Sequence, residues 1–197
     1  MMGKEKRTFS IKGLEVRESD EEAAPSKIVG YGAVFDSPAD IAGCFTEIIS
    51  PGAFKKALDS NSDVRALFNH NWDCVLGRVK SGTLMIEEDE RGLRFEVTPP
   101  ETTWVKDLKK SMKRGDIDQC SFGFIVTKDE WDYEAEPAVR TIKEVELYEI
   151  SVVSLPAYED TEAAVRSGDI LKRAKEEREQ SKKKQAIVNK IMEVLQK

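Results

Sequence analysis

Apolar and polar positions alternate along much of the chain, which predicts a protein built mainly of β-strands. Ser50 and Pro51 are residue types favoured at a helix start, so a short helix is predicted over 51–60. Apolar residues at helical spacing predict a second helix over 103–114, ended by Gly115. Strands are predicted over 9–16, 28–35, 64–68, 74–80, 83–87, 93–98, 119–126 and 144–155.

The order of these elements favours one fold class. The two helices are inserted among many strands and do not alternate with them regularly, as a doubly wound fold requires. We therefore expect an α+β, mainly β fold, with an antiparallel barrel-like sheet and flanking helices. Strand patterns end at Thr161, where helix-forming residues begin to dominate. The chain is thus expected to comprise a domain over residues 1–160 and a charged helical tail over residues 161–197.

Charge is distributed unevenly between these two parts. The formal net charge is −6, whereas Lys172–Gln185 contains seven basic and three acidic residues, a net +4. The overall balance argues against non-specific nucleic-acid binding by the whole chain. The tail offers little apolar surface before a narrow stripe formed by Ile187, Ile191 and Val194. We predict a solvated helix ending in a weak partner-binding face, and a frayed helix without a partner is the alternative.

Cysteine and histidine content limits the possible chemistry. Cys44, Cys74 and Cys120 form no CxxC pair, and the first residues lack the apolar core of a secretion signal. We therefore expect free thiols in a reducing cytoplasm, no membrane span, and no metal or cofactor. His70 is the one histidine, which excludes a zinc site built on two or three imidazoles of a single chain.

Ser121 is the candidate nucleophile. It lies in the strand predicted over 119–126, on the face opposite Phe122 and Phe124. Gly123 follows on the same face as Ser121, where a substrate backbone could approach closely. A serine hydroxyl is a poor nucleophile unless a base accepts its proton. The alternative is a strand serine bonded to its neighbours, which the pattern alone favours because no G-x-S-x-G motif is present.

His70 is the candidate base. It follows the strand predicted over 64–68 and is flanked by Asn69 and Asn71. Catalytic side chains are often held in loops at strand ends. A surface loop histidine is the alternative interpretation.

Glu149 is the candidate partner of this histidine. Strict alternation along the strand predicted over 144–155 places it on one face with Val145, Leu147, Ser151 and Val153. Burying a carboxylate is costly unless it is paired, and an imidazole would supply the partner. An edge-strand carboxylate facing water is the alternative. Glu144 and Glu146 lie nearer the polar start of the strand and suit the role less.

Together these residues supply the parts of a Ser–His–carboxylate triad. Glu149 would fix the imidazole tautomer, and His70 would take the proton of Ser121 and return it to the leaving amine. Backbone N–H groups would stabilise the oxyanion. Sequence spacing does not place the three side chains together in space.

Five sequence blocks, in order, carry a resemblance to a known family. Together they resemble the prohead proteases of tailed phages, which are related to the herpesvirus assemblin proteases. The resemblance extends over about residues 28–158. The blocks are GYGAVFDSPAD, ISPGAFKKAL, LFNHNWDCVLGR, QCSFGF and LYEISVVSLPAY.

The resemblance implies a serine endopeptidase on an assemblin-like β-barrel surrounded by helices. Its family histidine falls on His70, its serine on Ser121, and its acidic member on Glu149, where the herpesvirus relatives have a second histidine. It implies action inside the assembling prohead in a host bacterial cytoplasm. The implied substrates are the scaffolding part of the major capsid protein and the protease itself, with a homo-oligomer expected and no membrane or specific nucleic acid as partner.

Three rival hypotheses remain at this stage. The chain could be a non-catalytic capsid scaffolding protein on the same fold, with the tail as its working part. It could be a cysteine hydrolase that uses Cys120, although strand alternation places Cys120 on the face opposite Ser121. It could bind nucleic acid through Lys172–Gln185, although that segment lacks an aromatic platform beside it.

Overall fold

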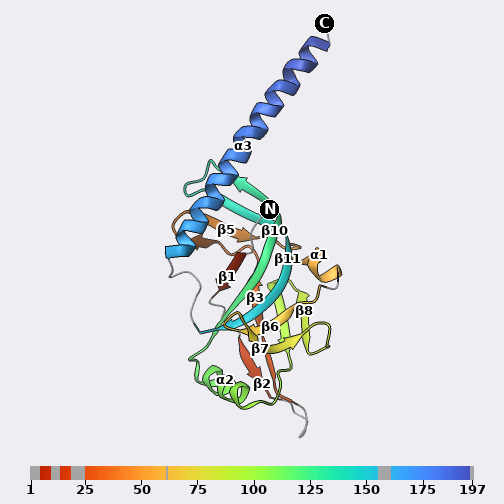
Figure 1. The fold of residues 1–197 in the computed structure, drawn as a ribbon, viewed down its shortest axis with the longest axis vertical. Helices are drawn as coiled ribbons and strands as arrows, with labels where there is room; N and C mark the ends of the chain where they lie inside the picture. The colour runs from red at the N-terminus through yellow and green to blue at the C-terminus, as the bar shows by residue number, and fades with distance from the viewer. Residues whose placement is uncertain (1–4, 10–13, 19–24, 61, 155–160, 196–197) are drawn as a thin grey trace.

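The computed structural model describes residues 5–9, 14–18, 25–60, 62–154 and 161–195, which form two β-sheets and three helices (Figure 1). The larger sheet has seven strands: β1 (Glu5–Phe9), β4 (Ala39–Ile41), β5 (Phe45–Ile49), β6 (Arg65–Phe68), β7 (Asn71–Arg78), β10 (Gln119–Asp132) and β11 (Val139–Val153). The smaller sheet has four: β2 (Glu15–Arg17), β3 (Lys27–Val34), β8 (Leu84–Glu88) and β9 (Gly92–Val97).

Strands β10 and β11 form the centre of the larger sheet and pair antiparallel with each other. On its other side, β11 pairs in parallel with β5 and then with β6. The predicted antiparallel barrel is therefore wrong in two respects: the sheet is mixed, and the described strand pairings leave both sheets open. The physical reason is that β11 lies far along the chain from β5 and β6, so no tight turn sets their relative direction. The broader prediction, a mainly β fold with helices, is confirmed.

The core lies between the two sheets. A side chain added at Gly32 in β3 would contact Leu93 in β9 and Ile150 in β11, which shows how closely the sheets pack. The Phe54 and Phe122 rings meet edge to face with their centroids 5.5 Å apart. The Phe122 ring stacks on Phe124 with a centroid separation of 4.5 Å. Aromatic contacts of this kind add to the stability gained by burying apolar surface.

Alternation along β10 agrees with the sequence prediction over 119–126, whereas the facing stretch of β11 contains a break at Tyr148. Gly123 pairs with Glu149, but the next residue, Phe124, pairs with Leu147, so Tyr148 is an extra residue in β11. Such a β-bulge shifts the alternation by one position. Val145 and Leu147 consequently join Ile150 and Val152 in the core, and their predicted position on the face of Glu149 is wrong.

The short helix begins later than predicted. Helix α1 covers Lys55–Asp59 with Phe54 at its N-cap, after a turn over 51–54. Ser50 does not cap it, because its hydroxyl donates instead to the Ile142 carbonyl at 3.0 Å. Helix α2 (Thr103–Arg114) matches the prediction, and Gly115 ends it with a left-handed φ of 80°. Burial of Val105, Leu108 and Met112 accounts for its amphipathic pattern.

The strand predictions are otherwise close at most positions. The hairpin of β8 and β9 is confirmed, whereas β7, β10 and β11 are each longer than predicted. The strand predicted over 9–16 is described only near its ends, where β1 reaches Phe9 and β2 begins at Glu15. The residues between them fall partly outside the described ranges.

Helix α3 (Thr161–Leu195) extends away from the sheets for much of its length (Figure 1). Near its middle, the Arg178 guanidinium pairs with Glu134 at 3.1 Å and lies over the Tyr133 ring. Ile187 and Ile191 are exposed, as the predicted apolar stripe requires, while the side chain of Val194 lies outside the described set. Within the described residues, no helix is both long and apolar enough to cross a membrane.

Candidate active site

His70 lies in a tight turn between β6 and β7. Phe68 pairs with Asn71 across the two strands, so Asn69 and His70 form the turn between them. Both have left-handed φ values, 51° for Asn69 and 56° for His70. This conformation is typical of the turn that joins a two-residue hairpin, and asparagine adopts it readily. Positive φ is uncommon in residues other than glycine, although histidine is enriched among those that adopt it, and backbone held in this region is concentrated at functional sites.

Contacts with the end of β11 hold the turn in place. The Asn69 backbone N–H donates to the Val152 carbonyl at 2.9 Å, and the Asn69 side-chain oxygen accepts from the Ser154 N–H at 2.9 Å. The His70 backbone N–H donates to the Ser151 hydroxyl at 3.2 Å. These bonds fix the imidazole over the sheet because both residues of the turn are tied to the same strand.

The structure brings His70 and Glu149 together. His70 Nδ1 lies 2.7 Å from Glu149 Oε1, and Glu149 is 1% exposed. The other carboxylate oxygen, Oε2, accepts the Ser151 hydroxyl at 2.6 Å. Ser151 therefore donates to the carboxylate while it accepts from the His70 backbone. A carboxylate at Nδ1 favours the imidazole tautomer that carries its proton there, which leaves Nε2 as a proton acceptor.

Gly123 makes room for this carboxylate. A side-chain carbon at position 123 would lie 2.4 Å from Glu149 Oε1 and 2.8 Å from the Tyr148 ring. The glycine was predicted to admit a substrate backbone, but in the structure its empty side is filled by Glu149. The bulge at Tyr148 contributes to the same arrangement, since it turns Glu149 away from the core.

Ser121 lies on the same face of the sheet, opposite Ser151. Directly opposed residues of an antiparallel pair share a face, and the register joins Ser121 with Ser151 and Gly123 with Glu149. The Ser121 side chain is fully buried, and its hydroxyl donates to the Arg7 carbonyl of β1 at 2.8 Å. The structure thus places the three predicted residues on one face, but the serine hydroxyl is bonded to β1 rather than to the imidazole.

Two buried polar atoms at this site lack a hydrogen-bond partner in the described part of the chain. One is His70 Nε2, and the other is Gln119 Oε1, which lies two residues before Ser121 in β10. Buried polar atoms are nearly always paired, so an unpaired one calls for an explanation. At Nε2 the explanation is chemical: this is the atom that would accept a proton from a nucleophile or bind an incoming group.

Cys120 is poorly suited to the role of nucleophile. It lies in the core on the opposite face of β10, and burial raises the pKa of its thiol far above the usual range. Because the thiolate is the reactive form, this environment keeps the sulfur unreactive. The other two cysteines, Cys44 and Cys74, are partly exposed.

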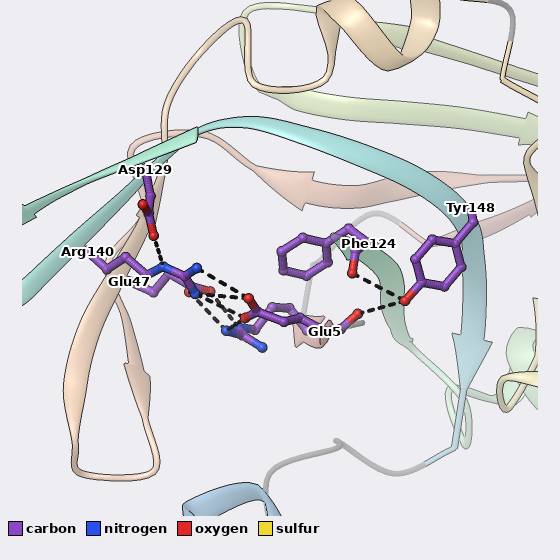
Figure 2. Close-up of polar contacts among 7 residues, drawn as sticks. Glu5, Glu47, Phe124, Asp129, Arg140 and Tyr148 are labelled. Atoms are coloured by element: carbon purple, nitrogen blue, oxygen red, sulfur yellow. Dashed lines mark hydrogen bonds and ion pairs between the residues drawn. The ribbon is translucent and has the colours of Figure 1, made fainter. Parts of the chain in front are cut away.

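A second buried polar group, here termed the charged cluster, joins β1 to three other strands of the larger sheet, β5, β10 and β11 (Figure 2). The Arg140 guanidinium contacts Glu47 at 3.1 Å, Glu5 at 3.0 Å and Asp129 at 2.7 Å. Arg7 pairs with Glu47 and with Glu5. Burial alone would raise the pKa of Glu5, but the neighbouring Arg7 and Arg140 charges hold it below its ordinary value.

Tyr148 connects this cluster to the bulge beside Glu149. Its hydroxyl donates to the Phe124 carbonyl at 3.2 Å and to the Glu5 carbonyl at 3.4 Å (Figure 2). Burial, together with the nearby Glu149 and Glu5 charges, raises the pKa of Tyr148 to about 12. The phenol therefore stays protonated and acts as a donor that links β1, β10 and β11.

The described residues contain no group of three or more His, Cys, Asp and Glu side chains arranged to hold a metal ion. What the site does contain is a partly buried imidazole with a carboxylate on one nitrogen, a buried second nitrogen without a hydrogen-bond partner, and a serine on the same sheet face. These are the components with which hydrolases activate a serine. The arrangement therefore defines a candidate site for serine-dependent acyl transfer.

Comparison with known proteins identifies the family. The sequence profile of the caudovirus prohead serine protease family matches residues 12–176, and the chain belongs to that family. The prohead protease of Enterobacteria phage HK97 is 40% identical over 146 residues, which cover 71% of this chain. The chain spans 60% of the length of that relative. The family predicted from the five sequence blocks is confirmed.

One solved structure is also similar. The capsid assembly protease of bacteriophage T4 matches with a TM-score of 0.46 at 12% identity, covering 77% of this chain and 99% of that one.

Sequence reasoning missed the residues that support the site. Ser151 was recognised only as a neighbour of Glu149 on the strand, whereas its hydroxyl orients the carboxylate. Asn69 was recognised only as part of a loop, although an asparagine before the histidine in a two-residue connection is a turn signal. Arg7, Glu47 and Arg140 gave no local signal, because they meet across separate strands.

Proposed function

We propose that this chain is a serine endopeptidase with Ser121 as nucleophile, His70 as general base and Glu149 as the partner of the imidazole. The observation that carries the proposal is the His70–Glu149 hydrogen bond, which leaves Nε2 buried and unpaired on the sheet face of Ser121. An unpaired buried nitrogen costs stability, and a catalytic role is one reason for a protein to keep it. Membership of the prohead serine protease family supports the same class of enzyme.

The proposed reaction has two steps. The Ser121 hydroxyl rotates away from Arg7 and attacks the peptide carbonyl carbon, while its proton moves to His70 Nε2. His70 then gives that proton to the leaving amine, which breaks the C–N bond and leaves an ester on Ser121. Water attacks the ester in the second step, with His70 again accepting and then returning a proton. The Glu149 carboxylate stabilises the imidazolium each time it forms.

The proposed substrate is the scaffolding portion of the major capsid protein, cut inside an assembling prohead in the host cytoplasm. Self-cleavage and assembly into a homo-oligomer are part of the same proposal, as is a kinship with the herpesvirus assemblins. We further propose that residues 1–160 form the protease domain and that the tail over residues 161–197 docks on a scaffold or partner. The exposed Ile187 and Ile191 at the far end of α3 support that role for the tail.

Co-expression with the capsid protein tests the enzyme assignment. The wild-type chain should shorten the capsid protein, as read by intact mass, whereas Ser121→Ala and His70→Ala should leave it whole. Ser81→Ala is a matched control, since Ser81 is exposed on a distant turn, and it should cut like the wild type. Equal shortening by all four chains would refute the assigned site. Normal assembly without any shortening would favour the scaffolding alternative.

A further inference from the structure

The edge of β10 that carries Ser121 is covered by β1, an element for which the proposed reaction has no use. The two strands pair antiparallel, with Thr8 opposite Ser121, and the Ser121 hydroxyl donates to the Arg7 carbonyl at 2.8 Å. An extended peptide that binds a sheet edge forms the same kind of ladder. Strand β1 thus has the position and direction of a bound peptide, with one of its carbonyls at the nucleophile.

The side chain of Arg7 occupies a buried acidic site formed by side chains of other strands. Arg7 is 5% exposed, and its Nη2 lies 3.0 Å from Oε2 of Glu47, which is 2% exposed. Without β1, two carboxylates, Glu47 and Asp129, would share the single positive charge of Arg140. The vacated place would therefore carry a net negative charge and would favour an incoming cation. An arginine fits best, because its planar guanidinium bonds a carboxylate through two nitrogens.

Polar contacts of Glu5 and Arg7 add to the backbone ladder that attaches β1 to β10. Glu5 pairs with Arg140 and Arg7, and the Tyr148 hydroxyl donates to the Glu5 carbonyl at 3.4 Å (Figure 2). Backbone bonds to a sheet edge can be replaced one for one by those of another extended chain. A peptide that supplies its own arginine would also replace the Arg7–Glu47 contact, so it can make the same contacts as β1. A free peptide incurs a cost in association entropy that the tethered strand does not incur, so it displaces β1 only at high concentration.

We infer that β1 occupies a peptide-binding site, and that this site takes extended peptides with an arginine at the place of Arg7, recognised by Glu47. The inference rests on the proposed function and deepens it: the substrate carries a basic residue whose carbonyl lies at Ser121. While β1 is bound, Ser121 is fully buried and its proton is directed to Arg7 rather than His70. The folded chain is therefore latent until β1 is displaced.

Peptide binding tests the inference without relying on catalysis. The probe is a fluorescein-labelled peptide with the sequence KEKRTFSI of residues 4–11, and its partner KEKATFSI lacks the arginine. Binding is measured by fluorescence anisotropy on full-length chains that carry Ser121→Ala, with or without Arg7→Ala. The Arg7→Ala chain should bind KEKRTFSI at least tenfold more tightly than the chain with Arg7, and should bind KEKATFSI at least tenfold more weakly than KEKRTFSI.

A matched control is Arg17→Ala, which removes an exposed arginine of β2 whose ion pair with Glu15 is also exposed. It should bind both peptides as the parent chain does. Equal binding of the two peptides to the Arg7→Ala chain, or no gain from Arg7→Ala, would overturn the inference. If both peptides bind as expected but the wild-type chain does not shorten the capsid protein, the proposed function is contradicted and the inference about the peptide site is not.

Hydrogen exchange on the Ser121→Ala chain, which retains Arg7 and cannot cut the peptide, gives a second measurement, which decides the matter if Arg7→Ala does not fold. Saturating KEKRTFSI should raise the exchange rate of the Glu5–Phe9 amides at least tenfold, because the peptide displaces β1, and should leave the amides of β9 unchanged. Unchanged exchange in Glu5–Phe9 at a peptide concentration that saturates binding would contradict the inference.

Discussion

Two buried polar groups lie in the same sheet and differ in how completely they are paired. In the charged cluster around Arg140, the carboxylates and guanidinium groups bond one another, and none of their buried atoms is left without a partner. In the group formed by His70, Glu149 and Ser151, one buried nitrogen remains unpaired. The difference separates a group that holds strands together from one prepared to exchange a proton.

The largest effect should come from changing the partner of the imidazole. Glu149→Gln keeps the size of the side chain but favours the wrong imidazole tautomer, so kcat should fall by roughly 10⁴-fold. The measurement is kcat and KM on a capsid-derived substrate. Glu146→Gln is the matched control on the same strand, because Glu146 is exposed, and it should leave kcat within about twofold of the wild type. Wild-type kcat in Glu149→Gln would show that Glu149 does not take part in catalysis.

Breaking the charged cluster should affect stability first. Arg140→Ala leaves the buried Glu47 and Glu5 with Arg7 as the cation they still share, and removes the ion-pair partner of Asp129, so the free energy of unfolding should fall by about 3–5 kcal/mol. Urea unfolding measures this change. Arg17→Ala removes an exposed arginine and should change the same quantity by less than about 0.5 kcal/mol. Similar values for the two variants would mean that the cluster does not hold β1 and β5 to the sheet.

A smaller effect on activity is expected from Gly123→Ala. The added methyl group would lie 2.4 Å from Glu149 Oε1 and must push the carboxylate away from His70. A displacement of about 1 Å at a catalytic group costs roughly 10²-fold in rate, so kcat should drop by about that factor. Gly168→Ala in α3 meets no atom within 4 Å and serves as the control. Full activity of Gly123→Ala would show that the close contact is not needed.

The smallest effect concerns acid stability. The pKa of Glu5 is lowered from its ordinary value of 4.5, so its ion pairs stabilise the fold above that pH, and this contribution is lost as pH falls through the lowered pKa. The free energy of unfolding of the wild type should therefore decline below 4.5, and Glu5→Gln should reduce that slope by at most about 1.4 kcal/mol per pH unit. Urea unfolding across this range measures both slopes, and identical slopes would contradict the assignment.

The candidate residues could be predicted from sequence because each has a local signal. Ser121 lies in a strand with clean alternation, and His70 is the only imidazole available. Glu149 was found for a partly wrong reason, since strict alternation placed it with Val145 and Leu147, which the structure buries in the core. A β-bulge leaves no periodic signal of its own, and alternation cannot be followed across it.

The fold was predicted in class but not in topology. Most strands and helix α2 follow from periodicity, which depends on neighbouring residues, whereas the short strands β4 and β5 were not predicted. The parallel pairing of β11 with β5 and β6 depends on contacts between distant segments, as does the pairing of Arg7 with Glu47. Sequence pattern reports which face of a strand is apolar, whereas it does not report which strand lies beside it.

The extra residue at Tyr148 makes the length of β11 as important as its composition. Loss of any one residue between the paired positions Val145 and Glu149 would restore uniform alternation, and the carboxylate at 149 would then point among the phenylalanine rings of the interior. A deletion there would disable the chain even if every chemical group of the site were retained. Homologous chains that keep this chemistry are therefore expected to vary by substitution along this stretch and to avoid insertions and deletions.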